Sequence, residues 1–478
     1  MQKYKGVIYV VKREQLVSDM EKMLGKDKVI STELKRFTYS YDSSFLSQLN
    51  EYFPDVVVCP NSTEEVSKIM VYANENEVPV TPRGAGSGQT GGSVAYKGGI
   101  VLDMSLWNDI IEIDDANMQV VVRPGVVHAD LNAALAPYNM FFPPDPGSSK
   151  MATIGGMVSN NASGLRAVKY GSTFQYVLGL EVVLPSGEII KTGGLKCKAL
   201  KSVSGIDLTR LYNGSEGTLG VITEIRVKIL PKPPARGIML ALFDKLEDSA
   251  YTVLDVFKAG LVPSGMEILD EGGIKCANQY KPELKIPEVQ AAVFFEINGS
   301  KAAVEYEGLV IKEIAEKRAS SIEWATDPDR MAQLWQGRAV IGAASARAQK
   351  GKTRIFAGED VCFPISKVPE ALKGIKQLGA DNGIQVIIYG HIGDGNIHTA
   401  PIIDPLNSKE VDAAMRVADG IHRLALKMGG STTGEHGVGL TRAPYMREEH
   451  GLALDIMKRI KDAIDPKGIM NPGKIWSE

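Results

Sequence analysis

The sequence has few cysteines and no long hydrophobic run, and each shortage excludes a class of protein. Its four cysteines, Cys59, Cys197, Cys276 and Cys362, stand apart from one another. No pair has the spacing of zinc ligands or of an iron–sulfur cluster, so we expect reduced, buried thiols and no cluster within this chain. The N-terminus mixes charged and apolar residues, and no stretch has the length of a membrane span or signal sequence. We therefore expect a soluble, cytoplasmic protein without a transmembrane segment.

A surplus of one charge is also missing. The chain has 54 lysines and arginines against 57 aspartates and glutamates, which gives a net charge of -3. This balance argues against a nucleic-acid partner. At 478 residues, with 44% hydrophobic and 23% charged residues, the sequence is long and apolar enough for two or three globular domains.

Two of the six histidines lie in one short glycine-rich string, Gly390–His398. The apolar run Ile384–Tyr389 before it favours a buried strand, and the residues at 393–396 are typical of a turn. A reversal of the chain at this turn would bring His391 and His398 side by side. Paired imidazoles on a hairpin can hold a divalent metal, although they can also simply stabilise a hairpin.

A second string, Thr433–Gly437, offers a carboxylate and another imidazole next to each other, Glu435 and His436. Its flanking glycines allow the backbone or a ligand to approach closely. The concentration of three histidines and one glutamate in two glycine-rich strings favours a functional site over a set of unrelated loop histidines.

The first half of the chain is rich in loops of small residues. The strand-like run Val78–Thr81 leads directly into Pro82–Gly92, a loop whose exposed backbone N–H groups can bind a pyrophosphate. Further loops of this kind lie at 145–149, 153–156, 160–164 and 214–222. Several such loops suit a long, phosphate-bearing ligand, and the alternative is a loop-rich α+β fold without a ligand.

The pattern of the chain divides it into four parts. Residues 1–54 form a lead-in, and the glycine-rich part covers 55–235. From about Gly237 strands and helices alternate, which indicates a second α+β domain over 236–430 that carries the histidine hairpin. The segment 431–478 closes the chain. Single helices are expected at about 329–349 and 447–465.

These strings resemble those of a known flavoprotein family. Pro82–Gly88 together with the loops at 145–148, 153–156, 163–164 and 216–222 resembles the FAD-binding domain of the vanillyl-alcohol-oxidase superfamily. The strings at 390–398, 434–437 and 471–474 resemble its FAD-linked D-2-hydroxyacid dehydrogenase branch, which includes D-lactate dehydrogenases and glycolate oxidase D subunits. The resemblance covers nearly all of the chain.

The resemblance implies an N-terminal FAD-binding domain, an α+β substrate or cap domain, and a C-terminal segment that returns to the flavin. FAD is expected to be non-covalent, because Gly84–Gly88 has no histidine for a covalent link. The residues implied to contact FAD are Pro82, Arg83, Gly84, Ala85, Gly86, Ser87, Gly88, Pro146, Gly147, Ser148, Thr153, Gly155, Gly156, Ser163, Gly164, Glu216, Gly220, Ile222 and Asn471.

By the same resemblance His391, His398 and Glu435 would bind a divalent metal, either zinc, iron or manganese. His436 would be the catalytic base. Arg338 matches a position that binds the substrate carboxylate, and the alternative is an arginine on the surface of a helix.

The chemistry of 2-hydroxy-acid oxidation needs these groups. A metal lowers the pKa of the substrate hydroxyl, a histidine can take its proton near neutral pH, and the flavin takes the hydride. Gly358 and Ala400 stand where the D-2-hydroxyglutarate branch tends to have lysine and asparagine. A small monocarboxylate such as D-lactate or glycolate is therefore expected.

The electron acceptor stays open at the level of sequence. Without a cluster in this chain, the reduced flavin would pass its electrons to quinone, oxygen or another protein, and a separate protein partner is favoured. The resemblance implies an iron–sulfur subunit or an electron-transferring flavoprotein as this partner. Two other functions are also compatible with the sequence: a non-catalytic flavin subunit that transfers electrons between partners, and a metal-dependent hydrolase that uses the C-terminal site alone.

Overall fold

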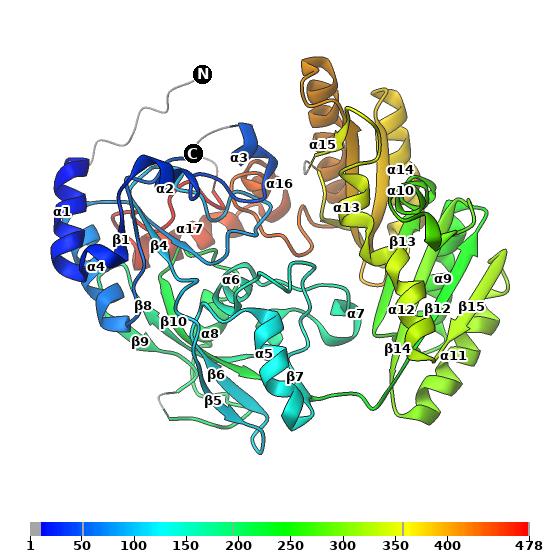
Figure 1. The fold of residues 1–478 in the computed structure, drawn as a ribbon, viewed down its shortest axis with the longest axis horizontal. Helices are drawn as coiled ribbons and strands as arrows, with labels where there is room; N and C mark the ends of the chain where they lie inside the picture. The colour runs from blue at the N-terminus through cyan, green and yellow to red at the C-terminus, as the bar shows by residue number, and fades with distance from the viewer. Residues whose placement is uncertain (1–10, 50–51, 195, 356–357, 477–478) are drawn as a thin grey trace. The chain divides into compact units, whose positions relative to one another are not determined.

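The computed structural model describes residues 11–49, 52–194, 196–355 and 358–476, and its contacts divide them into two compact units (Figure 1). The first unit takes the described residues of Met1–Ser163, Ser172–Pro231 and His436–Glu478. The second takes Gly164–Gly171 and the described residues of Lys232–Glu435. Each unit combines helices and sheets, which confirms the α+β class, whereas the exact domain boundaries stay a prediction.

A small, mostly parallel sheet begins the first unit. Its strand order is β1-β2-β4-β3, and β1 alone is antiparallel to its neighbour. The strands are β1 (Val29–Ile30), β2 (Val56–Val58), β3 (Val80–Arg83) and β4 (Ile100–Asp103). The nearby helices are α1 (Arg13–Leu24), α2 (Glu33–Phe37), α3 (Phe45–Leu49) and α4 (Thr63–Asn76). Ser62 caps α4, because its side chain accepts a hydrogen bond from the backbone N–H of Glu65.

The first unit also contains a five-stranded antiparallel sheet of order β5-β6-β10-β8-β9. Strands β7 and β11 pair with each other in a separate two-stranded sheet. The strands are β5 (Ile110–Asp114), β6 (Gln119–Val122), β7 (Met140–Phe141), β8 (Val177–Val183), β9 (Ile189–Lys191), β10 (Val221–Lys228) and β11 (Leu230–Pro231). Its helices are α5 (His128–Leu135), α6 (Ile154–Asn160) and α8 (Leu208–Tyr212). In β10 the buried residues Thr223, Ile225 and Val227 alternate with less buried ones, as expected for an antiparallel sheet with one covered face.

The C-terminal segment belongs to this first unit. It carries α16 (Met446–His450) and α17 (Ala453–Ile464), so the single helix expected at 447–465 is wrong. The break lies at Gly451, whose φ of 54° lies outside the right-handed helical region. After α17 the chain returns to the first sheet, where Met470 bridges Val80 of β3.

The second unit is built on one large sheet. Its order is β15-β12-β14-β13-β18-β19-β16, with β17 also paired to β19, and all of these pairs are antiparallel. The strands are β12 (Ala235–Phe243), β13 (Gly265–Asp270), β14 (Ala291–Gly299), β15 (Ser321–Ala325), β16 (Thr353–Arg354), β17 (Val361–Cys362), β18 (Gln385–His391) and β19 (Asn396–Ile403).

Helices cover both faces of this sheet. One set consists of α9 (Leu246–Lys258), α11 (Lys301–Ala315), α14 (Val368–Asp381) and α15 (Ser408–Lys427). The other consists of α10 (Glu271–Tyr280), α12 (Pro328–Ala339) and α13 (Ile341–Ser345), which share a core with the sheet residues Leu240, Phe294 and Tyr389. The helix expected at 329–349 is therefore two shorter helices.

One short segment from the first half of the sequence, Gly164–Gly171, belongs to the second unit. Helix α7 (Ala167–Tyr170) contacts β13, and Arg166 donates hydrogen bonds of 2.6 and 2.8 Å to both carboxylate oxygens of Glu296 on β14. Lys169 and Tyr170 donate to Asn298 on the same strand. These bonds attach residues 164–171 to the large sheet.

Two sequence expectations concern the chain as a whole. All four cysteines are free, but only Cys276 is buried, so the expectation of four buried thiols is wrong for Cys59, Cys197 and Cys362. In the described ranges, no helix combines the length and the apolar character that crossing a bilayer requires.

Candidate active site

The histidine hairpin forms as expected. Strands β18 and β19 pair antiparallel, with Tyr389 opposite His398 and His391 opposite Asn396. Because side chains alternate along a strand, Tyr389, His391 and His398 all lie on one face of the large sheet. The side chains of both histidines are almost fully buried, at 6% and 5% exposure for His391 and His398.

Three potential metal-binding atoms gather on this face. His391 Nε2 lies 3.1 Å from Glu435 Oε1 and 3.3 Å from His398 Nε2, and His398 Nε2 lies 3.4 Å from the same glutamate oxygen. Two ligands bound about 2.1 Å from one metal are about 3.0 Å apart at a right angle and about 3.4 Å apart at a tetrahedral angle. The donor set of two imidazoles and a carboxylate thus has the spacing that a divalent transition metal needs.

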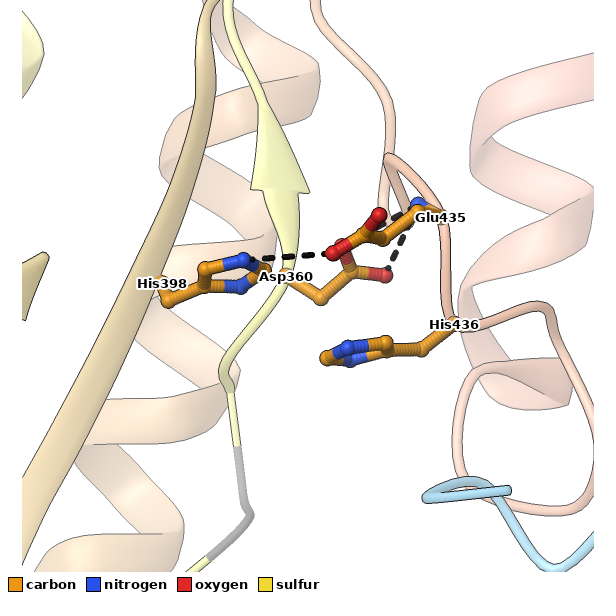
Figure 2. A group of neighbouring side chains, drawn as sticks. All are labelled: Asp360, His398, Glu435 and His436. Atoms are coloured by element: carbon orange, nitrogen blue, oxygen red, sulfur yellow. Dashed lines mark hydrogen bonds and ion pairs between the residues drawn. The ribbon is translucent and has the colours of Figure 1, made fainter. Parts of the chain in front are cut away.

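Asp360 holds the segment that carries Glu435. It is fully buried, and its carboxylate accepts hydrogen bonds from Asn396 Nδ2 (2.9 Å), Thr433 Oγ1 (2.7 Å) and the backbone N–H of Glu435 (3.1 Å). Asp360, His398 and Glu435 offer ligand atoms within 4.8 Å of one another (Figure 2). Since three donors already occupy the Asp360 oxygens, this residue is better suited to support Glu435 than to bind a metal itself.

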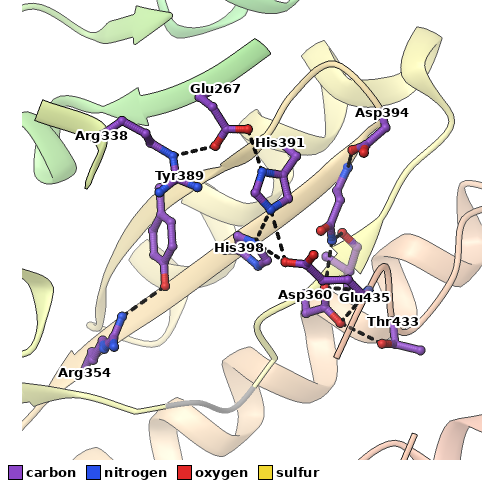
Figure 3. Close-up of polar contacts among 12 residues, drawn as sticks. Glu267, Arg338, Arg354, Asp360, Tyr389, His391, Asp394, His398, Thr433 and Glu435 are labelled. Carbon is purple, nitrogen blue, oxygen red and sulfur yellow. Dashed lines mark hydrogen bonds and ion pairs between the residues drawn. The ribbon is translucent and has the colours of Figure 1, made fainter. Parts of the chain in front are cut away.

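Glu267 lies behind His391, away from the metal-binding atoms. One of its oxygens is 2.6 Å from His391 Nδ1, and the other accepts a 2.6 Å hydrogen bond from Arg338 Nε (Figure 3). Burial acts to lower the pKa of His391, but the carboxylates of Glu267 and Glu435 outweigh it and hold this pKa well above its usual value. The two carboxylates therefore favour a positive charge at His391.

Arg338, predicted to bind the substrate carboxylate, lies on α12 and is 8% exposed. It is therefore not a surface arginine. Its Nε is engaged by Glu267, and its guanidinium lies 5.6 Å from the ring centre of Tyr389. Its two terminal Nη groups donate to no residue among those that the structure describes, so they are available to a bound anion.

The residues predicted to contact FAD lie in the first unit, except Gly164, which the contacts assign to the second. The loops that carry these residues lie close to one another. A Cβ on Gly84 would lie 2.3 Å from Thr153 Oγ1, and one on Gly217 would lie 3.3 Å from Pro82. Asn471 Nδ2 donates to the carbonyl oxygens of Gly92 and Glu216.

Other predicted flavin residues have different positions. Thr153 caps α6, and Gly155 and Gly156 form its first turn. The guanidinium of Arg83 is buried and donates hydrogen bonds to the backbone carbonyls of Tyr41 and Ser93. The remaining predicted positions lie in loops after β3 (Gly84, Ala85, Gly86, Ser87, Gly88), before α6 (Pro146, Gly147, Ser148), after α6 (Ser163) and before β10 (Gly220), or within β10 (Ile222).

Glu216 connects these loops to the C-terminal segment by hydrogen bonds. Its side chain is 8% exposed and accepts hydrogen bonds from the backbone N–H groups of Val438 (2.7 Å) and Gly439 (2.8 Å). Burial raises the pKa of Glu216, although these two bonds favour its charged form. His436, the predicted base, follows Glu435 directly and begins this C-terminal segment of the first unit.

Two glycines of the predicted FAD loops lie beside open space, and two polar side chains near the first loop lack partners among the described residues. A Cβ on Gly88 or on Gly147 would meet no atom within 4 Å, so the backbone of both loops faces open space. Gln89 Oε1 and Ser93 Oγ are buried and find no hydrogen-bond partner among the described residues. Open backbone and unsatisfied polar atoms in and near the predicted FAD loops fit a bound FAD.

Two residues of the site were not predicted in any role from the sequence, Glu267 and Asp360. A carboxylate inside an otherwise apolar strand is a detectable signal, because glutamate and aspartate are rarely fully buried without a partner. Glu267 stands within Gly265–Asp270 and has 0% exposure. The strand pattern thus marks the residue, but its partners depend on the pairing of β13 with β18.

Comparison with known proteins gives the family. A model described as the C-terminal domain of FAD-linked oxidases matches residues 232–475, and a FAD-binding domain model matches residues 54–193. The glycolate oxidase subunit GlcD of Bacillus subtilis is 38% identical over 98% of this chain and 97% of its own length. The chain belongs to the FAD-linked D-lactate dehydrogenase and glycolate oxidase D-subunit family.

Other relatives of this FAD-linked oxidoreductase are D-lactate dehydrogenases. The enzyme of Anaerostipes hadrus is 35% identical over 88% of this chain and 89% of its own length. The mitochondrial D-lactate dehydrogenase [cytochrome] of Arabidopsis thaliana is 37% identical over 97% of this chain and 80% of its own length. The family relation establishes FAD as the cofactor and FAD-linked oxidation as the type of reaction.

Solved structures agree on the fold. The 4-ethylphenol oxidase from Gulosibacter chungangensis has a TM-score of 0.81 at 19% identity and is covered over 99% of both chains. p-Cresol methylhydroxylase has a TM-score of 0.78 at 18% identity over 97% of both chains. These proteins belong to the vanillyl-alcohol-oxidase superfamily, so the predicted fold is confirmed.

Proposed function

We propose that this protein oxidises a small D-2-hydroxy acid, most simply D-lactate to pyruvate, with FAD and a divalent metal. The observation that carries the proposal is the cluster of His391, His398 and Glu435 against one face of the large sheet. Glu267 lies on the same face and accepts a hydrogen bond from Arg338. The three ligand atoms are 3.1 to 3.4 Å apart, and Arg338 keeps its terminal guanidinium groups available. A metal site next to a buried cation suits a substrate with a hydroxyl beside a carboxylate.

Each residue has a distinct task in this proposal. Arg338 binds the substrate carboxylate with its terminal N–H groups and thereby orients the adjacent C2 carbon. His391, His398 and Glu435 would hold the metal, which supplies Lewis acidity that lowers the pKa of the substrate hydroxyl. His436 takes the hydroxyl proton on a ring nitrogen, as the family resemblance implies. FAD, held non-covalently, supplies the hydride acceptor.

The substrate is proposed to be a monocarboxylate because two positions of the second unit offer no second polar anchor. Ala400 is buried in the apolar core of the sheet. A Cβ on Gly358 would lie 2.6 Å from the Cα of Ala418, so a longer side chain does not fit there without a backbone shift. A distal carboxylate would find neither a lysine nor an asparagine at these positions.

The electrons are proposed to leave for a separate protein, either an electron-transferring flavoprotein or an iron–sulfur subunit. The four cysteines of the sequence have no cluster spacing, so this polypeptide supplies no second redox centre of that kind. An alternative, as in a glycolate oxidase-type assembly, is transfer through an iron–sulfur subunit to quinone. The metal is proposed to be zinc, iron or manganese, all of which accept imidazole and carboxylate ligands.

The test is an anaerobic visible spectrum of the purified protein, recorded before and after addition of D-lactate. L-lactate, glycolate and D-2-hydroxyglutarate serve as parallel additions. The same series is repeated after removal of metal with a chelator and after return of zinc, manganese or iron(II). We expect D-lactate to bleach the flavin of the metal-loaded protein, and we expect bleaching to stop without metal.

Other outcomes distinguish the alternatives. Bleaching by glycolate in place of D-lactate would change the substrate but keep the mechanism. A flavin that no 2-hydroxy acid reduces would favour an electron-transfer subunit without catalysis. Full bleaching after metal removal would contradict the role given to the metal. His436→Ala is expected to keep FAD and lose bleaching, and undiminished bleaching would reject His436 as the base.

A further inference from the structure

One buried carboxylate connects two parts of the proposed site. Glu267 lies on β13 with 0% exposure, and its two oxygens have different partners. Oε1 is 2.6 Å from Nδ1 of the proposed metal ligand His391, and Oε2 accepts a 2.6 Å bond from Nε of the proposed substrate-binding Arg338 (Figure 3). Both partners are themselves buried, so water does not substitute for either contact.

The contact with His391 decides which ring nitrogen carries the proton. An imidazole that binds a metal through Nε2 needs a free electron pair there, so its proton has to be on Nδ1. A carboxylate only accepts hydrogen bonds, and therefore it favours the tautomer with the Nδ1 proton. Nε2 then points toward Glu435, from which it is separated by 3.1 Å.

The contact with Arg338 fixes the direction of the guanidinium. Because Glu267 occupies Nε, the edge formed by the two terminal nitrogens stays available for an incoming carboxylate. A guanidinium is planar, so one short charged bond is enough to restrict the plane in which the others lie. The same carboxylate thus supports the metal ligand and the substrate anchor at once.

We propose that Glu267 is a positioning residue that keeps His391 in its metal-binding tautomer and aims Arg338 at the substrate carboxylate. This inference rests on the proposed function. Metal affinity and substrate affinity then share one support, and a change at Glu267 should weaken both.

The sharpest variant is E267Q, because glutamine has nearly the same shape but only one acceptor end. Both partners of Glu267 are donors in the proposed state. If the amide oxygen faces His391, the amide N–H groups oppose the Nε–H of Arg338. If the amide is reversed, it donates to His391 Nδ1 and moves the ring proton to Nε2, where it blocks the metal. Neither orientation satisfies both partners.

A matched control is available on the neighbouring strand. Glu296 on β14 is also buried, and it accepts hydrogen bonds from Arg166 and Ser264 without contact to His391 or Arg338. The control variant E296Q removes the same charge from the same sheet. It reports any general loss of stability or FAD content that follows from burying an amide in place of a carboxylate.

The experiment measures zinc and manganese affinity of the metal-stripped proteins by competition with a chromophoric chelator, and KM and kcat for D-lactate at saturating metal. For E267Q we expect metal affinity to fall by roughly 10- to 100-fold. We also expect KM to rise more than kcat falls, since the disturbed Arg338 contributes mainly to binding. E296Q should keep wild-type metal affinity and KM.

Several results would overturn the inference. Metal affinity and KM of E267Q equal to those of the wild type would do so, and so would equal losses in E296Q. If E267Q does not retain FAD, E267D takes its place, because it keeps the charge but its shorter side chain reaches only one of the two donors. Wild-type values in E267D would then count against the inference.

The inference fails separately from the proposed function. If the wild-type protein binds no metal and D-lactate does not reduce its flavin, the proposed function fails. If the wild type does both and E267Q behaves like it, only the role of Glu267 is rejected.

Discussion

Removing the side chain of Asp360 should weaken the proposed metal site although Asp360 is not one of its three proposed ligands. The Asp360 carboxylate accepts a hydrogen bond from the backbone N–H of Glu435 at 3.1 Å and another from Thr433 at 2.7 Å. In Asp360→Ala both bonds disappear inside a buried region, and Glu435 is no longer held toward the histidines. The backbone adds to the effect, because Asp360 has a φ of 70°, where alanine is less favourable than aspartate or asparagine.

The expected magnitude follows from the number of bonds. A hydrogen bond to a charged group contributes about 1.5–3 kcal/mol. A change of about 1.4 kcal/mol corresponds to a factor of ten in affinity. If metal binding has to restore the position of Glu435, Asp360→Ala should weaken metal affinity by roughly 10- to 100-fold.

Asp360→Asn is the matched variant. Its amide oxygen can still accept from the Glu435 backbone, its amide N–H can donate to the Thr433 hydroxyl, and asparagine tolerates the positive φ. We therefore expect a much smaller loss than in the alanine variant. Chelator competition on the metal-stripped proteins measures both. A folded, FAD-containing Asp360→Ala protein with wild-type affinity would refute the reasoning, and equal losses in both variants would show that charge, rather than hydrogen bonding, matters.

Three further predictions concern the ligand set, the flavin loops and a buried lysine. His398→Ala should keep FAD but lose bound metal, as measured by elemental analysis. The control His422→Ala removes another buried histidine of the second unit and should keep its metal. Metal at wild-type stoichiometry in both variants would contradict the ligand set. Gly84→Ala places a Cβ 2.3 Å from Thr153 Oγ1, so we expect the first loop to shift and the FAD content to fall. The ratio of flavin to protein absorbance measures this content. An unchanged ratio would count against this loop as a flavin contact. Burial lowers the pKa of Lys474 from 10.5 to about 7, so between these values the unfolded chain binds a proton that the folded chain lacks, and stability should rise with pH. Relative to Lys474→Met, the free energy of unfolding should increase by about 1.4 kcal/mol per pH unit in denaturant titrations, and parallel pH profiles would disprove the shift.

The local motifs of this chain can be predicted from sequence because each is complete within a few residues. The hairpin at 385–403 contains its own strands, turn and two histidines, and the N-cap of α4 needs only Ser62 and Glu65. The first glycine-rich loop also follows its strand directly. For such segments propensity and turn chemistry agree with the final fold.

The support of the site cannot be predicted in the same way. Glu267 is 124 positions from His391 in sequence, and Asp360 is 75 positions from Glu435. Their contacts depend on which strands pair and in which register, and a shift by one residue would turn Glu267 to the opposite face of the sheet. The helix breaks at 340 and 451 likewise depend on packing that periodicity alone does not contain.

Neither unit is made from one continuous stretch of chain, and this has a consequence for biosynthesis. Strand β3 lies at the edge of its sheet, and its Val80 exchanges backbone hydrogen bonds with Ile469 and Asn471. These partners are synthesised long after β3 itself. Until they emerge, the edge of β3 lacks the chain that covers it, and an uncovered strand edge can pair with other chains. The first unit is therefore complete only after the second unit has been synthesised, and loss of residues 469–471 would leave this edge open.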